Sequence, residues 1–168
     1  MSQHDFCFGV LEESLRPQVN HIVAEEWGGP WLVTNGRRFD TAGLPGYACR
    51  TEQQLRGFLL LRKDALEWEI AVLWSGMENH GIATELLRMA EESARQAGCR
   101  RIWLETTNDN IRAFRFYQRR GYDLCAFRRN GMDAVRGYKP EIPPLGEEGI
   151  PLRHCLEFEK CLEDGKSL

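Results

Sequence analysis

The sequence predicts a mixed α/β (α+β) fold, in which a central, mixed and mostly antiparallel sheet of six to seven strands is flanked by about four helices. Three observations support this fold class. Short polar turns separate three strand-like segments between residues 44 and 74, and short connections make neighbouring strands antiparallel. Amphipathic segments at residues 81–96 and 109–120 alternate with further strands. The strand–helix–strand unit around Gly81 requires a right-handed crossover between parallel strands, which makes the sheet mixed.

Length and composition are those of a globular protein, and we expect a single domain spanning residues 1–168. A chain of 168 residues is long enough to bury a full core. Apolar residues make up 42% and charged residues 28%, which are ordinary values. The net charge of -3 offers no reason to expect a nucleic acid or an anionic membrane as a partner.

Signals for membrane insertion and secretion are not evident. No apolar run reaches the ~18 residues that span a bilayer, and residues 1–14 show no basic region followed by an apolar core. We therefore expect a cytoplasmic protein whose six cysteines are reduced and mostly buried. His154, Cys155 and Cys161 lack the paired spacing typical of zinc ligands, so no metal site is predicted.

The N-terminal part is predicted to hold a strand, a helix and an ambiguous segment. Residues 6–12 alternate enough for a strand, and residues 15–27 carry apolar side chains close to helical spacing. Gly28-Gly29-Pro30 ends this helix. Residues 31–40 contain the turn signal Asn35-Gly36 and are compatible with a loop or short helix that walls a substrate pocket, or with plain packing.

Three strands follow, at residues 44–50, 55–63 and 66–74. The polar segments 51–54 and 63–65 form the turns between them. Because side chains alternate along a strand, the third strand should place two sets of residues on opposite faces. The first set is Trp68, Ile70 and Val72, and the second is Glu67, Glu69, Ala71 and Leu73.

The remaining elements alternate between helix and strand. Helices are expected at residues 81–96 and 109–120, ended by Gly98 and Gly121. Strands are expected at residues 101–106, 122–128 and 152–162. Residues 131–149 are rich in Gly and Pro and should form a long connection, with one turn of helix at residues 133–138.

The most informative stretch joins the third strand to the helix at residues 81–96. Its centre reads Glu78-Asn79-His80-Gly81-Ile82-Ala83. The first N–H groups of a helix lack intrahelical partners, and the helix dipole is positive at this end. The small residues Gly81 and Ala83 allow a ligand to come close to these groups. The stretch therefore predicts an anion-binding turn.

A second motif, about thirty residues later, makes the first one specific. It reads Asn110-Ile111-Arg112-Ala113-Phe114-Arg115-Phe116-Tyr117, followed by Gly121-Tyr122. Together and in this order, the two motifs resemble the acyl-coenzyme A binding core of the GNAT-type N-acetyltransferases, over about residues 55–130. That family has Gln/Arg-x-x-Gly-x-Gly/Ala in the turn and Asn-x-x-Ala-x-x-x-Tyr in the later helix. The resemblance implies a GNAT-like fold with a splayed acyl-CoA-binding cleft, to which the C-terminal strand at residues 152–162 also belongs.

The resemblance further implies an enzyme that moves an acetyl group from acetyl-CoA, its cosubstrate, to a primary amine. Backbone N–H groups of the turn would hold the pyrophosphate. The end of the third strand would splay from its neighbour, bind the pantetheine arm and polarise the thioester carbonyl. Asn110 would hold the pantetheine or a nearby backbone group, and it equally suits a helix N-cap. The implied cofactor-binding set is Leu73, Trp74, Glu78, Asn79, His80, Gly81, Ile82, Ala83, Thr84, Asn110, Ala113 and Tyr117.

Glu78 departs from the family pattern, which usually has Gln or Arg at this position. A carboxylate directed at a pyrophosphate is unfavourable, so we expect Glu78 to point away while backbone groups supply the binding. His80 either contributes positive charge or is exposed without a role. Six arginines near the second motif either meet a phosphate or form a solvated face. They are Arg112, Arg115, Arg119, Arg120, Arg128 and Arg129.

Tyr117 is the best candidate for a catalytic acid, because its hydroxyl is able to protonate the departing thiolate. The alternative is a core aromatic residue beside Phe114 and Phe116. Glu67 and Glu69 are the candidate general bases, and each also suits a structural ion pair or a role through water. No Ser/His/Asp order or activated Cys is apparent, which favours direct attack by the amine over a covalent acyl-enzyme.

The acceptor pocket is expected between residues 27–47, the residues after Tyr122 and the connection at 131–149. Its aromatic side chains suit a cationic amine or simply core packing. Its acidic side chains suit a polyamine or an aminoglycoside, or are plain surface. These residues are Trp27, Trp31, Phe39, Tyr47, Trp74, Glu25, Glu26, Asp40 and Asp133. A small amine, an antibiotic and a protein amine are all compatible acceptors. A non-catalytic acyl-CoA-binding or sensing module on the same fold is the alternative function. Because members of the family often dimerise, a homodimer is expected by resemblance.

Overall fold

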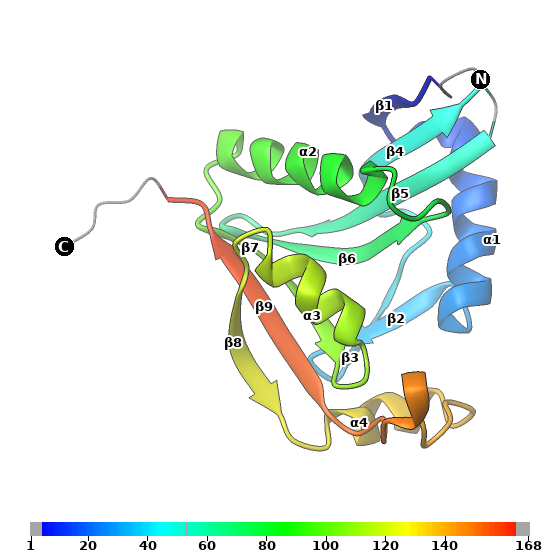
Figure 1. Cartoon of the computed structure of the whole chain (residues 1–168), viewed down its shortest axis with the longest axis vertical. Coiled ribbons are helices and arrows are strands. Elements are labelled where there is room, and N and C mark those ends of the chain that lie inside the picture. The colour runs from blue at the N-terminus through cyan, green and yellow to red at the C-terminus, as the bar shows by residue number, and fades with distance from the viewer. Residues whose placement is uncertain (1–4, 53, 164–168) are drawn as a thin grey trace.

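The computed structural model describes residues 5–52 and 54–163, and its elements follow the predicted order (Figure 1). The strands are β1 (Cys7–Val10), β2 (Trp31–Thr34), β3 (Arg37–Asp40), β4 (Gly46–Thr51), β5 (Gln54–Lys63), β6 (Glu67–Ser75), β7 (Arg101–Thr107), β8 (Asp123–Arg128) and β9 (Cys155–Cys161). The α-helices are α1 (Arg16–Trp27), α2 (Ile82–Gln96), α3 (Ile111–Gln118) and α4 (Gly131–Tyr138). Two short 3-10 helices, η1 (Glu13–Leu15) and η2 (Glu147–Gly149), complete the set. The turn predicted at residues 51–54 contains Gln53, which lies outside the described residues.

The central sheet confirms the predicted mixed topology. Within the described residues it has seven strands in the order β1-β4-β5-β6-β7-β9-β8. Neighbouring strands are antiparallel, with the exception of β6 and β7, which are parallel. The chain passes through α2 between these two strands, as a parallel pair requires a crossover. At the centre of the sheet, two neighbouring strands therefore run in the same direction.

The helix α2 packs against one face of the sheet, because its apolar residues recur at helical spacing. The residues of α2 that are buried by this packing are Ile82, Leu86, Leu87, Ala90, Glu91 and Ala94. Burial of one Leu side chain contributes roughly 1.5–3 kcal/mol. Gly57 of β5 lies directly beneath the helix, since a Cβ atom at this position would be 2.5 Å from Cγ2 of Ile82. The missing side chain brings the first turn of α2 close to the sheet.

The opposite face of the sheet is covered by α1 and by the β2–β3 hairpin. Val19 and Val23 of α1 are fully buried and pack with Phe58 and Leu60 of β5. The two faces thus have separate cores, one under α2 and α3 and one under α1. Figure 1 shows α1 and α2 lying on different sides of β4 and β5.

The ambiguous segment at residues 31–40 forms the hairpin β2–β3, which is neither a loop nor a short helix. Its turn residues Asn35 and Gly36 have φ angles of 51° and 70°. Two consecutive positive φ angles are the requirement of the type I′ turn, for which Asn-Gly is the preferred pair. The Asn35-Gly36 signal in the sequence therefore corresponds to the two-residue turn of a hairpin.

A bulge in β6 overturns the predicted division of its faces. Leu60 pairs with Val72, but Leu61 pairs with Ile70, so Ala71 is an extra residue in β6. As a result, Ile70 belongs to the core under α2, whereas Val72 belongs to the core under α1. The predicted common face of Trp68, Ile70 and Val72 is therefore wrong beyond Ala71, because a bulge shifts the alternation by one residue.

The C-terminal connection is more ordered than expected. The helix α4 has eight residues, Gly131–Tyr138, in place of a single turn. Arg136 of α4 holds the segment after it by donating to the backbone carbonyls of Ile142, Pro143 and Leu152. These long-range bonds explain how a Gly- and Pro-rich stretch adopts one defined path.

The cysteines are free, as expected, but only half are buried. Cys49, Cys99 and Cys155 lie inside. The exposed ones lie on the edge strands β1 and β8 or at the end of β9, where one side of the strand faces solvent. None of the helices in the described part of the chain is long and apolar enough to cross a bilayer.

Candidate active site

A cleft opens where β6 and β7 separate. The two strands pair at Glu67–Arg101, Trp68–Ile102 and Glu69–Trp103, and not beyond. After this point β6 continues to Ser75 beside β5 alone. The volume of the cleft is about 990 Å³, and its lining includes Leu73 and Trp74. The splay expected near the end of this strand is present, and it leaves one edge of β6 without a strand partner among the described residues.

The N-terminus of α2 faces this cleft. Gly81 is the N-cap and adopts a left-handed conformation with a φ angle of 73°, and no side chain of the described residues caps the helix. A Cβ atom at Gly81 would meet nothing within 4 Å, so the approach to the helix end is open. Of the predicted turn residues, Glu78, Asn79, Gly81, Ile82, Ala83 and Thr84 line the cleft. Open N–H groups at a helix N-terminus form a site for an anion.

Glu78 belongs to the residues that line the cleft, whereas His80 does not. The imidazole of His80 is within 2.5 Å of the carbonyl of Glu78 and packs edge-on against Phe6, outside the cleft lining. The carboxylate of Glu78 accepts a hydrogen bond from Arg112 of α3 at 2.6 Å. The nearby guanidinium offsets the charge of Glu78 and makes the position tolerable.

Asn110 and Ala113 meet in the N-cap of α3. The side-chain oxygen of Asn110 accepts a hydrogen bond from the N–H of Ala113 at 3.0 Å. The N-cap alternative is therefore correct for Asn110, and both residues also line the cleft. A cap of this kind typically stabilises a helix by about 1 kcal/mol.

The arginines of the second motif separate into two groups. Arg112, Arg115, Arg119 and Arg120 line the cleft. Arg120 also donates to the hydroxyl of Thr84 at 2.6 Å and stacks on the ring of Phe116. This contact ties the end of α3 to the first turn of α2. Arg128, in contrast, is outside the lining and forms ion pairs with the buried carboxylates of Glu105 and Glu157.

Tyr117 is both a core residue and a cleft residue. Its ring packs against Tyr122 and Phe158, with centroids 5.3 and 6.3 Å away. The hydroxyl makes no hydrogen bond with the described residues. Because no fully buried polar side-chain atom of these residues lacks a partner, this hydroxyl is accessible, and it opens onto the cleft that Tyr117 lines. Burial raises the pKa of Tyr117, and nearby Arg120 lowers it only partly. The phenol is therefore neutral at any ordinary pH.

Glu67 and Glu69 lie at the closed end of the splay, outside the cleft lining. Glu67 is exposed and accepts a hydrogen bond from Arg101 at 3.0 Å. Glu69 is buried and pairs with Arg62 at 2.7 Å. Burial raises the pKa of Glu69, although Thr34 and Arg62 act in the opposite direction. The geometry favours the ion-pair alternative for both residues.

Glu105 of β7 is the acidic residue that the sequence reasoning missed. It lines the cleft, and its side chain is only 9% exposed. It pairs with Arg128 at 2.8 Å and accepts a bond from the N–H of Asn35 in the β2–β3 turn. Burial raises its pKa, against Arg128 and the Asn35 N–H, and Glu69 and Glu157 add to the rise. The sequence did contain a signal for Glu105. Its side chain faces the side of the strand opposite to Leu104 and Ile102, in a strand predicted to lie inside the sheet.

The predicted acceptor residues are only partly in the cleft. Trp27 and Trp74 line it, together with Glu26 at the end of α1 and Glu147 of η2. The other aromatic residues lie elsewhere. Tyr47, for example, bonds to Ser93 of α2 on the far side of β4. Glu25, Asp40 and Asp133 do not belong to the lining either.

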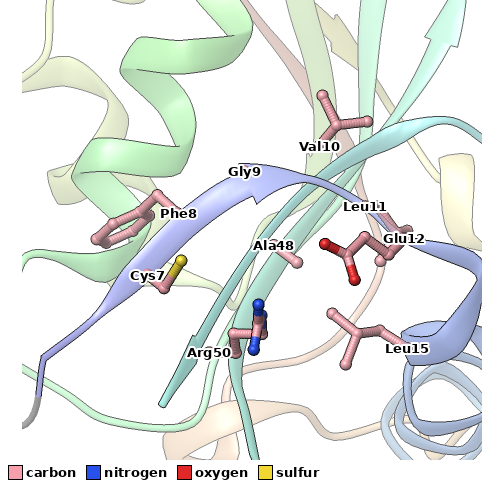
Figure 2. A pocket seen from close by; sticks show the side chains of 9 residues that line it. All are labelled: Cys7, Phe8, Gly9, Val10, Leu11, Glu12, Leu15, Ala48 and Arg50. Atoms are coloured by element: carbon pink, nitrogen blue, oxygen red, sulfur yellow. The ribbon is translucent and has the colours of Figure 1, made fainter. Parts of the chain in front are cut away.

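A smaller hollow of about 400 Å³ lies between β1, β4 and the short helix η1 (Figure 2). Glu12 and Arg50 are its charged residues, and Leu15 forms part of its wall. Phe8 is directed from β1 toward α2, away from Leu15. This hollow contains no residue of either motif. In the described residues, no group of three or more His, Cys, Asp or Glu side chains is arranged to hold a metal ion.

Comparisons with known proteins identify the family of this chain. A model of the "Acetyltransferase (GNAT) family" matches residues 16–122. The Bacillus subtilis (strain 168) protein YdhI is 38% identical over 152 residues, which are 90% of this chain and 95% of that protein.

Solved structures show the same fold at low sequence identity. A GNAT family acetyltransferase from Elizabethkingia anophelis with acetyl-CoA bound has a TM-score of 0.67 and 14% identity, covering 95% of this chain and 100% of that one. The yncA protein of Salmonella typhimurium with acetyl-CoA has a TM-score of 0.68 and 13% identity, covering 96% of both chains. The family match and the 38% identical relative decide the assignment: this chain belongs to the GNAT acetyltransferase family.

Proposed function

We propose that the protein is an N-acetyltransferase that moves the acetyl group of acetyl-CoA to a primary amine by direct attack. One observation carries the proposal. The open N-terminus of α2, the unpaired edge of β6, the hydroxyl of Tyr117 and the carboxylate of Glu105 all line one cleft. Acetyl-CoA has an anionic end, an amide-rich arm and a reactive thioester, and the cleft offers a matching group to each.

The cosubstrate would bind along the splay. The N–H groups from Gly81 to Thr84 and the arginines of α3 suit its phosphates. The free edge of β6 near Leu73 and Trp74 suits the amides of the pantetheine arm, as an added strand would. A backbone N–H of this edge would also donate to the thioester oxygen, where negative charge develops during attack.

Glu105 is the better general base on geometric grounds. It lines the cleft, whereas Glu67 and Glu69 are held by Arg101 and Arg62 away from it. A carboxylate with a raised pKa is a stronger base than an exposed one. Glu69, buried next to it, supports that rise.

The reaction balances with these groups. The acceptor ammonium gives one proton to Glu105, directly or through water, and the neutral amine attacks the thioester carbon. A C–N bond forms, and the tetrahedral intermediate passes its second N–H proton to solvent as the C–S bond breaks. The leaving thiolate receives a hydrogen bond and then a proton from Tyr117, which solvent reprotonates. Glu105 releases its proton to solvent before the next turnover. The products are the acetylated amide and free coenzyme A.

The test is release of free thiol from acetyl-CoA in the presence of a broad panel of amines, with acetyl-CoA binding measured separately by calorimetry. Thiol release that depends on an amine supports the enzyme. Binding of acetyl-CoA without turnover on any amine would instead support a non-catalytic sensing module on the same fold. Glu78 is the feature that favours the second candidate, because it adds negative charge at the phosphate end of the cleft.

A further inference from the structure

We infer that the acceptor is a small amine that carries a second positive charge, such as an alkyl diamine. This inference rests on the proposed acetyl transfer and deepens it by naming the class of acceptor. It comes from how charge is divided along the cleft and from how the walls on the acceptor side are held.

The charges that line the cleft are segregated. Every positive side chain in the described lining comes from α3 or from the turn that follows it. Apart from Glu78, the carboxylates of the lining come from other elements, namely Glu26 from α1, Glu105 from β7 and Glu147 from η2. Glu78 belongs to the phosphate end, where Arg112 pairs with it. The elements that line the cleft therefore divide into one that suits an anionic cosubstrate and others that suit a cation.

Glu147 is placed by a buried contact. The residue Asp109, which precedes the cap of α3, is only 7% exposed. One of its carboxylate oxygens accepts a hydrogen bond from the backbone N–H of Glu147 at 3.0 Å. Gly146 makes the approach possible, because a Cβ atom there would lie 2.0 Å from the same carboxylate. The wall that bears Glu147 is thus anchored to the helix that binds the cosubstrate.

Glu26 and Trp27 are placed by a buried lysine. Lys139, after α4, is 4% exposed and donates to the carbonyls of Trp27 and Trp31. Its ammonium lies over the ring of Trp31 at 4.5 Å. A cation at the last carbonyl of α1 is favoured by the helix dipole. Lys139 lies outside the lining, so it fixes this wall without adding positive charge to the cleft surface.

An amine with two positive charges matches both Glu105 and the pair of carboxylates of Glu26 and Glu147. Glu105 takes the proton from the amine that attacks, so this nitrogen becomes neutral. Glu26 and Glu147 are exposed residues of the same lining, and their carboxylates hold the nitrogen that stays charged. Trp27 adds an aromatic face to which an alkylammonium is attracted. A monoamine has nothing for these residues to bind, and a terminal carboxylate would be repelled by them.

The experiment compares matched acceptors on the full chain. The probes are 1,4-diaminobutane and n-pentylamine, which have the same number of heavy atoms, together with 4-aminobutanoate. Homologous pairs from three to six carbons cover the unknown spacing. We expect kcat/KM for the best diamine to exceed that of its monoamine by at least about tenfold. The Glu26→Gln and Glu147→Gln variants should each reduce this ratio at least threefold while the KM for acetyl-CoA stays the same.

Glu25→Gln is the control, because Glu25 adjoins Glu26 on α1 but pairs with His21 outside the cleft. It should keep the wild-type ratio. Equal kcat/KM for diamine and monoamine, or equal loss of both acceptors in the two cleft variants, would overturn the inference and leave the proposed function standing. Turnover of other amines but of no diamine would have the same meaning. No turnover of any amine despite binding of acetyl-CoA would overturn both.

Discussion

Tyr117 and Tyr122 form a matched pair that separates a catalytic hydroxyl from a structural one. Their rings touch in the same core, with centroids 5.3 Å apart, and both are almost fully buried. The hydroxyl of Tyr117 opens onto the cleft and has no partner among the described residues. The hydroxyl of Tyr122 donates to the buried carboxylate of Glu91 at 3.1 Å. Replacing each Tyr with Phe keeps the ring and removes one hydroxyl.

The two variants should fail in opposite ways. Tyr117→Phe breaks no hydrogen bond of the described residues, so the free energy of unfolding should change by less than about 0.5 kcal/mol. Its kcat should fall by about 10²-fold or more, which is the usual contribution of a general acid. Tyr122→Phe removes a hydrogen bond to a charged group, worth about 1.5–3 kcal/mol. Lys160 still pairs with Glu91 at 3.0 Å, so we expect a loss near the lower value and an unchanged kcat.

Thermal denaturation and thiol release measure these two effects. A loss of about 1.5 kcal/mol corresponds to a fall in Tm of about 3–6 °C for a chain of this size. Full activity in the Tyr117→Phe protein would refute the role of its hydroxyl. A large fall in Tm for the same variant, with an equal fall in activity, would show that this hydroxyl is structural.

Three further predictions follow from single positions. Burial raises the pKa of Glu105, and only its ionised form is a base, so kcat/KM should rise with pH through that raised pKa. Glu105→Gln should abolish this acid limb of the pH profile, whereas Glu69→Gln should keep it. A limb that persists without Glu105 would assign the base elsewhere. Glu78→Gln removes negative charge at the phosphate end, so acetyl-CoA should bind more tightly. The gain measured by calorimetry should be about two- to fivefold, since exposed ion pairs are worth only about 0–1 kcal/mol. Weaker binding would show that the carboxylate helps to bind the cosubstrate. Gly57→Ala places a methyl group 2.5 Å from α2 and should cost about 1–3 kcal/mol of stability in denaturant unfolding. The control Gly9→Ala meets nothing within 4 Å and should be neutral.

The turn at the start of α2 shows why part of the site was predictable. Its elements are local: Gly81 as a left-handed N-cap, and small residues beside it, are properties of neighbouring positions. The same holds for Asn110, whose cap reaches only three residues along the chain. Short-range geometry of this kind is encoded within a few residues, so spacing alone reveals it.

The bulge at Ala71 shows where such reasoning ends. Nothing in the strand itself distinguishes Ala71 as the extra residue, because its position follows from pairing with Leu60 and Leu61 of β5. The shift reverses the faces beyond it, and a pattern with a period of two cannot reveal this. Glu105 was missed for a similar reason. Its place beside the cleft depends on the splay of β6 from β7 and on a turn seventy residues away.

The sequence by itself determined the fold class, the order of elements and the turn that faces the cleft, because helix periodicity, strand alternation and capping act over a few residues. The tertiary structure alone decided which carboxylates reach the cleft. Glu67 and Glu69 are close to it along the chain but are bound by Arg101 and Arg62. Glu105 and Glu147 come from distant elements and line it. Charge placement depends on long-range packing, since the partner of each buried ion is chosen by the fold and not by its neighbours in sequence.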